Sequence, residues 1–289
     1  MRQAVFASIA FAFFYGLTTV LQQKYVRTEI TPLHLNFLSY LIGSLFLTLY
    51  LFILKRKDLR MKPKTIWYGS LAGFFGSVLG DLFVLFGLTY SSSINWGILS
   101  TLSVFITFFL AVVFLREKVT LFKIIASIIS FIGAILVIYN FKSSVRFNWG
   151  DLLFLGATVS FSISNVINQA AYKYASITQI IYLRFIITAL IMFFLIIIFN
   201  PINKVNAWGF VFFNTANFIV GISLVIFIIK KAGAYFFTIA RNLVPICITV
   251  FAIFLLKDFP TLLQMVGGLL IIISIFIFQI KKDLLPVKK

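Results

Sequence analysis

Apolar stretches long enough to cross a lipid bilayer follow one another along almost the whole of this chain. A membrane-spanning helix needs roughly 20 mostly apolar residues to cross about 30 Å of hydrocarbon. Hydrophobic residues make up 62% of the 289 residues and charged residues only 11%, and no segment between the spans is long enough for a soluble domain. The expected spans are 4–23, 33–54, 66–88, 94–115, 121–139, 149–172, 177–199, 207–229, 234–256 and 261–280. The sequence therefore predicts an all-α integral membrane protein with ten transmembrane helices.

Basic residues are distributed unevenly between the two sides of the predicted spans. If the N-terminus is cytoplasmic, 17 of the 25 Lys and Arg residues fall in cytoplasmic segments and 6 in outer segments. Cytoplasmic loops of membrane proteins carry an excess of Lys and Arg. We therefore expect a multi-pass protein of the plasma (inner) membrane with both termini cytoplasmic. Its basic loops would contact membrane lipid, and we expect no nucleic acid partner.

The two halves of the chain repeat one pattern. A shift of 141 residues places Leu115-Arg116-Glu117 on Leu256-Lys257-Asp258 and Gly80 on Gly221. Each half has five spans, an odd number, so the second half must be inverted relative to the first. Inverted repeats are typical of secondary transporters, whose solute sites lie near the midplane between the halves. We predict one five-helix unit in 1–141 and a second in 142–289.

The matched charged turn links two helices in each half, at Phe114–Leu121 and again at Leu255–Leu262. Through this aliphatic-basic-acidic turn, each half resembles the five-helix EamA unit of the drug/metabolite transporter superfamily. The proline that often precedes the turn is Pro245 in the second half, whereas the first half has Val104. The resemblance covers essentially the whole chain. It implies a ten-helix fold of the transporter class, and it says almost nothing about the solute. We expect a transporter with two such halves to work by alternating access between them.

Polar side chains recur at helical spacing within several spans. Such side chains are costly in hydrocarbon and usually face the bundle interior or a watery cavity. The alternative is that they join helices by hydrogen bonds, which contribute roughly 0.6 kcal/mol each on average. The candidate pathway residues of this kind are Tyr15, Asn165, Asn168, Gln169, Asn214 and Asn217. The fifth and tenth spans are almost wholly apolar, so we expect them to face lipid or a second subunit, in a monomer or a homodimer.

Three ionisable residues lie within the spans, namely Asp81, Arg184 and Arg241. Two guanidinium groups at similar depth could bind a carboxylate or phosphate. Asp81 could bind an amino group or a proton, which would suit proton coupling. Either arginine could instead extend to the inner surface or pair permanently with Asp81. Trp96 and Tyr182 are candidate walls against which a solute could stack.

These residues favour a secondary transporter of a small zwitterionic or anionic metabolite, such as an amino acid. An exchanger of nucleotide- or phosphate-bearing metabolites is the alternative within the same class. A lipid-carrier flippase or a structural membrane subunit is an alternative of another class. An intramembrane enzyme would need clustered nucleophiles, bases or metal ligands, and the chain has one His and one Cys. We therefore expect no enzymatic activity, no cofactor, no metal and no catalytic residues.

Overall fold

The computed structural model describes residues 2–91, 93–115, 121–138, 148–199, 206–247, 251 and 262–284. These residues form helices, and no strand occurs among them. The elements are α1 (Arg2–Thr28), α2 (Pro32–Leu54), the short 3-10 helix η1 (Arg56–Leu59), α3 (Pro63–Gly73), the π-helix η2 (Phe74–Gly80), α4 (Asp81–Tyr90), α5 (Ser93–Ser100), α6 (Ser103–Leu115), α7 (Leu121–Ile138), α8 (Trp149–Ala171), α9 (Ile177–Phe199), α10 (Trp208–Ala232), α11 (Ala234–Arg241) and α13 (Leu262–Leu284). The prediction of an all-α membrane protein is confirmed.

Six helical segments of the described chain are long and apolar enough to cross a membrane: Arg2–Val26, Pro32–Leu54, Pro63–Tyr90, Trp149–Ala171, Ile177–Phe199 and Trp208–Ala232. The remaining predicted spans correspond to shorter apolar helices, Ser103–Leu115, Ile124–Gly133, Ala234–Cys247 and Met265–Ser274. The third span is one continuous helical segment made of α3, η2 and α4. Most of each of the two matched charged turns, residues 116–120 and 255–261, lies outside the described residues.

The fourth and ninth spans are each interrupted at the same place in their half. The predicted helix 94–115 is divided into α5 and α6 by Thr101 and Leu102. In the ninth span the turn residue is Asn242, which lies 141 positions after Thr101. Discontinuous helices near the midplane commonly flank solute sites in transporters. The sequence predicted each of these spans as one unbroken helix, because hydropathy alone does not report a break of one or two residues.

Local sequence signals fix where several helices begin. Thr31 caps α2 by accepting a hydrogen bond from the backbone N–H of His34, and Pro32 occupies the first turn. Asn148 and Asp151 form a capping box at the start of α8, which satisfies backbone N–H groups that have no helical partner. Gly233 has φ 94°, a left-handed conformation that favours glycine, and it turns the chain from α10 directly into α11.

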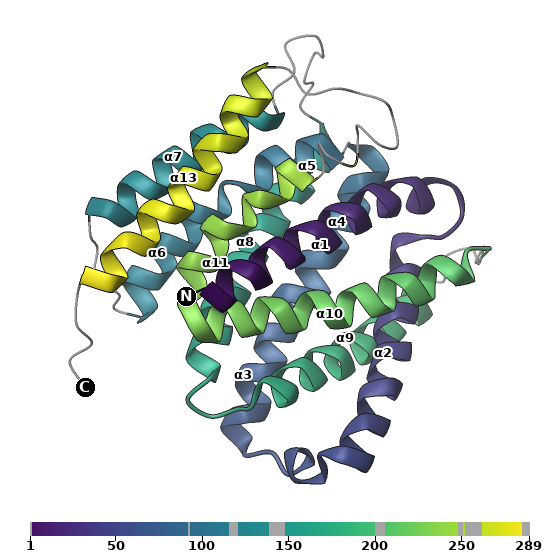
Figure 1. Cartoon of the computed structure of the whole chain (residues 1–289). Coiled ribbons are helices and arrows are strands. Elements are labelled where there is room, and N and C mark those ends of the chain that lie inside the picture. Colours follow the sequence, from purple (N-terminus) through teal and green to yellow (C-terminus); the bar gives the residue numbers. More distant parts are fainter. Residues whose placement is uncertain are drawn as a thin grey trace.

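The contacts between helices recur when each helix is replaced by its counterpart in the other half (Figure 1). α1 packs on α10 and α11, while its counterpart α8 packs on α3, α4 and α6. The equivalent helices α2 and α9 pack on one another, and so do α7 and α13. The start of α1 and the end of α13 lie on the same side of the molecule, as an even number of crossings requires.

α7 and α13 lie side by side at one edge of the molecule (Figure 1). They approach closely, since a Cβ atom added at Gly133 would lie 2.7 Å from the carbonyl oxygen of Gly267. Their outer faces carry exposed apolar side chains, including Ile128, Ile132 and Leu269. That these helices contact lipid or a second subunit stays a prediction.

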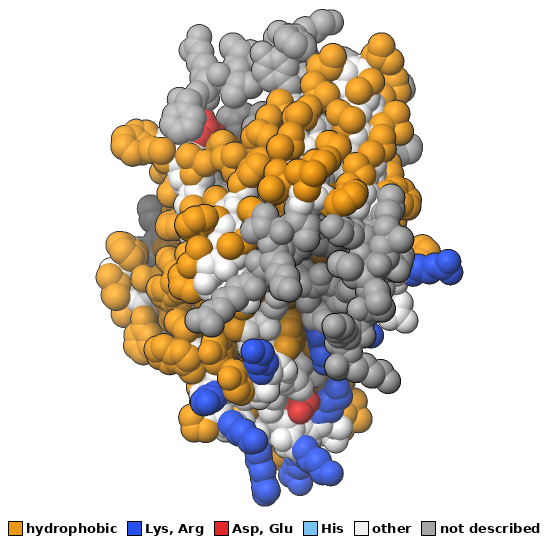
Figure 2. Space-filling model, turned by 90° about the vertical axis from the view of Figure 1, so that its left-hand side faces the viewer, with side chains coloured by type: hydrophobic (Ala, Val, Ile, Leu, Met, Phe, Trp, Pro, Cys, Tyr) orange, Lys and Arg blue, Asp and Glu red, His pale blue; other side chains and the backbone are white. Residues whose placement is uncertain are grey.

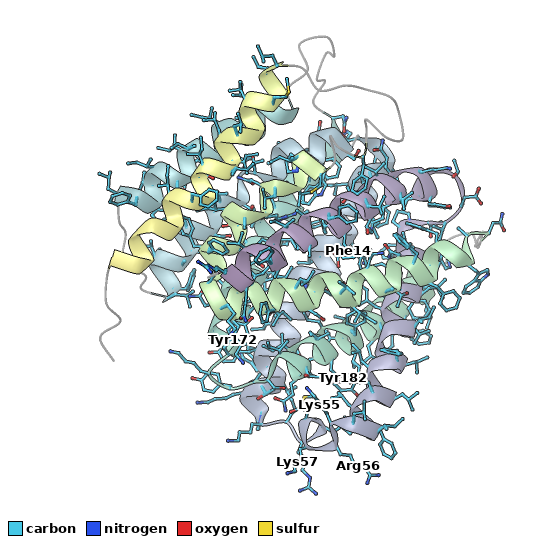
Figure 3. All side chains as sticks on the ribbon, in the orientation of Figure 1. Phe14, Lys55, Arg56, Lys57, Tyr172 and Tyr182 are labelled. Atoms are coloured by element: carbon cyan, nitrogen blue, oxygen red, sulfur yellow. The ribbon has the colours of Figure 1, made fainter. Side chains whose placement is uncertain are left out.

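Hydrophobic side chains cover much of the molecular surface, and Lys and Arg gather at its lower end (Figure 2). Figure 3 places Lys55, Arg56 and Lys57 at this end, where α2 meets η1. A band of apolar side chains bounded by charge is what a membrane-embedded surface requires. The predicted spans and the exposed surface therefore agree on an integral membrane protein.

Candidate solute-binding site

A cavity of about 80 Å³ lies between helices of both halves. One water molecule needs at least about 10–15 Å³, so the cavity has room for several waters or a small polar group. Its lining residues are Phe11, Tyr15, Tyr40, Asp81, Phe161, Ser164, Asn165, Arg184, Asn217, Phe218, Gly221, Ile222, Val225, Phe237 and Arg241. All three ionisable residues singled out from the sequence thus face one cavity.

Arg184 reaches the cavity from α9 and is held by the π-helix η2. Its Nε and Nη2 atoms donate hydrogen bonds of 3.2 and 3.0 Å to the Ser77 hydroxyl. A Cβ atom added at Gly76 would lie 2.5 Å from Arg184 Nη2 and 2.5 Å from the Ser164 hydroxyl. Gly76 therefore leaves the space that the guanidinium group occupies. The small residues of this helix, which would suit close helix packing, here also leave room for the buried guanidinium group of Arg184.

Asp81 is the first residue of α4, directly after the π-helix. The fully buried Tyr40 hydroxyl of α2 donates a hydrogen bond of 2.5 Å to its carboxylate. Asp81 is close enough to interact electrostatically with both Arg184 and Arg241. No ion pair within 4.0 Å joins it to either arginine in the part of the chain that the structure describes. The three charges therefore share one cavity and are each held by other partners.

Arg241 lies at the end of α11 inside a cage of aromatic rings. Its guanidinium carbon is 5.6 Å from the ring centroid of Tyr15, 5.1 Å from that of Trp96 and 5.2 Å from that of Phe161. Aromatic faces attract a cation when it lies within about 6 Å of the ring centroid. Trp96 is only 1% exposed and also packs on Phe154. Trp96 thus contacts Arg241 and does not line the cavity.

Two of the six amide and phenol residues predicted from helical spacing join helices and do not line the cavity. Asn214 joins three helices, because its Oδ1 accepts a 2.9 Å hydrogen bond from Gln22 and its Nδ2 donates a 2.9 Å hydrogen bond to Ser39. Gln169 accepts a 2.6 Å hydrogen bond from the backbone N–H of Ala234, which fixes the start of α11. Neither residue lines the cavity. Both are the interhelical connections that the sequence left open as the alternative.

Asn165, Asn217 and Tyr15 do line the cavity, whereas Asn168 does not. Asn168 is fully buried, and neither polar atom of its amide has a hydrogen-bond partner among the described residues. Tyr182 is remote from the site. It lies near Lys55 at the lower end of the molecule (Figure 3), where its hydroxyl is 3.4 Å from that of Thr48.

Several cavity residues were missed as candidates. Tyr40 belongs to a polar face of the second span, so a signal existed, but tyrosine is also common at buried positions. Ser77 and Ser164 are single hydroxyls in apolar helices, and only the fold brings them to Arg184 and Gly76. Phe11 and Phe237 look like ordinary apolar bulk in the sequence, yet their rings meet at the cavity, 5.3 Å apart.

Two contacts between helices flank the cavity along α1. A smaller cavity of about 20 Å³ shares Tyr15, Asn217 and Gly221 with the first and extends along α1 to Gln22. There the hydrogen bonds from Gln22 to Asn214 and on to Ser39 join α1, α10 and α2. We call Gln22, Asn214 and Ser39 the polar clasp. At the other end the rings of Phe11 and Phe237 join α1 to α11.

A helical membrane protein of two equivalent halves, with a charged cavity between them, belongs to the structural class of membrane transporters. A sequence model of the EamA-like transporter family matches residues 2–139 and 148–279. The match covers nearly the whole of both halves. The chain belongs to the EamA-like transporter family, and so to the drug/metabolite transporter superfamily. The expectation drawn from the charged turns is confirmed.

Two further comparisons agree with this assignment. A WAT1-related protein of Arabidopsis thaliana is 34% identical over 110 residues, which is 35% of this chain and 30% of that protein. The chain therefore spans about a third of the length of this curated relative. A solved crystal structure superposes with a TM-score of 0.72 at 17% identity, covering 95% of this chain and 98% of the other. That likeness shows the fold alone.

Proposed function

We propose that this protein is a secondary transporter that moves a small zwitterionic or anionic metabolite, such as an amino acid, by alternating access. The family assignment makes it a membrane transporter. The observation that carries the finer proposal is that Asp81, Arg184 and Arg241 line one cavity without forming an ion pair with one another in the described chain.

Charged groups inside a membrane protein need a reason to persist. A charge at the centre of a span costs roughly 2.5–3.5 kcal/mol on insertion scales. If these charges served only stability, direct pairing of Asp81 with an arginine would offset part of that cost. Here each is held by neutral partners: Ser77 for Arg184, Tyr40 for Asp81 and aromatic rings for Arg241. This arrangement leaves both guanidinium groups available to a ligand.

The chemistry of the three groups suggests how a solute would lie. A carboxylate accepts paired hydrogen bonds from a guanidinium group. An amino group, or a transported proton, would then bind at Asp81. One further part of the cavity wall is apolar, with Phe218, Ile222 and Val225 from α10. They suit the side chain of a small amino acid. Two charges of one sign and one of the other also match a solute with distinct ends.

Alternating access requires a closure on each side of the solute. The polar clasp lies toward the outer end of α1, and the contact between Phe11 and Phe237 lies toward its start. In our proposal, opening the clasp admits solute from one side, and separating these two rings releases it on the other. The excess of Lys and Arg in one set of loops supports a cytoplasmic location for both termini.

The test combines ligand-induced thermal shifts with uptake by proteoliposomes. The panel contains neutral and acidic amino acids, amines without a carboxylate, and phosphate esters. We expect one amino acid class to stabilise the purified protein and to be taken up. Arg184→Ala and Arg241→Ala should lose both effects while Arg60→Ala, which removes an exposed charge, keeps them. Equal thermal shifts in all three variants would remove the arginines from the site, and stabilisation by phosphate esters alone would identify a phosphate-bearing solute.

Proton coupling is tested separately with Asp81→Asn. If Asp81 carries the coupled proton, uptake driven by an imposed pH gradient should fall to the level seen without a gradient. Solute exchange, which needs no net proton movement, should persist. Gradient-driven uptake that is unchanged in Asp81→Asn would assign the carboxylate to solute binding or to structure.

A further inference from the structure

A larger cavity lies away from the solute site, in a groove between α2 and α9. Its volume is about 430 Å³, and its walls are mostly apolar, including Leu41, Leu45, Ile186 and Leu190. The two hydroxyl groups on its wall, those of Ser44 and Thr48, donate to carbonyl oxygens of their own helix. The groove therefore offers hydrocarbon contacts and few polar ones. Two of its three leucines are strongly exposed, Leu45 at 63% and Leu190 at 51%.

A cluster of exposed cations lies beyond one end of this groove. α2 ends at Leu54 and is followed by Lys55, Arg56 and Lys57, all exposed, at the lower end of the molecule (Figure 3). The Lys55 ammonium donates a 3.4 Å hydrogen bond to the Thr178 hydroxyl at the start of α9. Lys55 thus bridges the two helices that form the groove. Asp58 is the one carboxylate among residues 55–60, against four cations.

One end of the groove lies within reach of a lipid whose headgroup is at the cations. The wall of α2 runs from Phe37 to Thr48, eleven steps of 1.5 Å or about 16 Å, in the middle part of the helix. Thr48 is the wall residue nearest the cations, seven residues or about 10 Å along α2 from Lys55. One leaflet of hydrocarbon is about 15 Å deep. An acyl chain whose headgroup lies at the cluster would therefore enter the groove past Thr48.

We propose that the groove between α2 and α9 binds one acyl chain of an anionic phospholipid, whose phosphate binds Lys55, Arg56 and Lys57. Basic pockets between membrane helices are suited to acidic headgroups, and each Lys or Arg near the surface attracts them. Leu41 and Ile186 on the groove wall directly follow Tyr40 and Phe185 in the sequence. The rings of Tyr40 and Phe185 lie 4.8 Å apart. The bound lipid would hold α2 against α9 beside the solute site. Lipid binding at this groove does not depend on what the protein transports.

The headgroup half of the proposal is tested by native mass spectrometry of the full chain, delipidated in detergent. Phosphatidylglycerol, phosphatidylcholine of the same acyl chains and inorganic phosphate are titrated separately. We expect phosphatidylglycerol to bind at least tenfold more tightly than phosphatidylcholine, and phosphate alone not to compete. The triple variant Lys55→Gln, Arg56→Gln, Lys57→Gln should lose at least tenfold in phosphatidylglycerol affinity. The matched triple variant Arg60→Gln, Lys62→Gln, Lys64→Gln removes the same charge and should lose less than threefold.

The acyl-chain half is tested with two neighbouring substitutions on α2. Thr48→Trp fills the groove, whereas Leu49→Trp places the same ring on a neighbouring exposed position that does not line it. We expect a loss of at least fivefold in phosphatidylglycerol affinity for Thr48→Trp and no change for Leu49→Trp. Equal losses in the two triple variants, equal binding of the two lipids, or unchanged affinity in Thr48→Trp would each overturn the proposal. All the substituted side chains are exposed, so the variants should fold.

Discussion

The third and eighth spans are equivalents in the two halves, and both reach the cavity, but the glycine face of the third is filled by neighbouring side chains whereas the matching face of the eighth is open at Gly221. The shift of 141 residues places Gly73, Gly76 and Gly80 on Asn214, Asn217 and Gly221. Cβ atoms added at Gly76 and Gly80 would clash with Arg184 and Phe161, whereas nothing lies within 4 Å of a Cβ atom at Gly221. The third span also contains the π-helix η2, while α10 is α-helical throughout.

This difference separates what the repeat determines from what individual side chains determine. The repeat sets which helices meet, because α3 packs on α8 and α9 as α10 packs on α1 and α2. The glycines of the third span allow neighbouring helices to approach closely. The asparagines of the eighth span form hydrogen bonds to other helices or face the cavity. The two halves of an inverted repeat can exchange roles only if each half can adopt the packing seen in the other. The predictions below test how far the two faces differ.

The largest loss of stability is expected at Gly80, on the closely packed glycine face of the third span. Gly80→Leu would force its side chain into the Phe161 ring, which lies 2.7 Å from a Cβ atom at this position. We expect a loss of about 3 kcal/mol of stability, the upper end for overpacking. Thermal unfolding in detergent measures it. The equivalent Gly221→Leu should cost much less, because its side chain enters open space; similar losses in both variants would show that the two faces are packed alike.

Ser77→Ala should have the next largest effect. It removes the hydroxyl that accepts two hydrogen bonds from the buried Arg184. Hydrogen bonds to charged groups contribute about 1.5–3 kcal/mol, so we expect a loss of about 2 kcal/mol in the same unfolding measurement. Ser223→Ala on α10 is the matched control, since its hydroxyl bonds only to Ile219 of its own helix. If the two serine variants unfold at the same temperature, Ser77 does not hold the guanidinium group.

Asn214→Ala breaks the polar clasp between α1, α10 and α2. Interhelical hydrogen bonds in membranes contribute about 0.6–1.7 kcal/mol, so a loss of about 1 kcal/mol is expected. The clearer measurement is labelling of Asn217→Cys by a maleimide that does not cross membranes, in a Cys247→Ser background. Labelling should rise several-fold when the clasp is removed. Ser164→Ala, which removes the bond to Ala72 on the glycine face, should leave labelling as it was; a rise there instead would mean that the other face opens first.

Asn217→Ala should have the smallest effect on stability. Its amide donates only to the Phe213 carbonyl of its own helix, so we expect a change within about 0.5 kcal/mol. Because Asn217 lines the cavity, the stabilisation that a bound solute provides should nevertheless decrease. A variant that unfolds early but keeps its full solute-induced shift would assign Asn217 to packing.

Much of this structure follows from the sequence because membrane helices must satisfy their own backbone and hide their polar groups. Hydropathy gives the spans, the odd number of spans per half gives the inversion, and the cost of charge points to Asp81, Arg184 and Arg241. The helical spacing of polar residues does not determine the role of each one, since Asn214 and Asn217 share one helix face yet make different contacts. Their difference depends on where Gln22 and Ser39 lie, which no local pattern records.

Trp96 shows a second limit of the sequence. It was expected to stack against a solute, and it stacks against Arg241 instead. Whether an aromatic ring meets a ligand or a resident cation depends on the course of α5 and α11, both of which end at interruptions within their spans. Both interruptions lie within apolar spans, so apolar composition does not reveal them.

The interruption of the ninth span also bears on what surrounds the buried guanidinium group of Arg241. Arg241 is the last residue of α11, at the point where the backbone turns at Asn242. Peptide dipoles add along a helix and leave a partial negative charge at its C-terminal end, which favours a cation there. The C-terminal end of the helix and the faces of the aromatic rings can thus stabilise the guanidinium group, as a carboxylate would otherwise do. In the proposed transporter, an anionic solute would therefore meet a guanidinium group that it need not first detach from an acidic side chain.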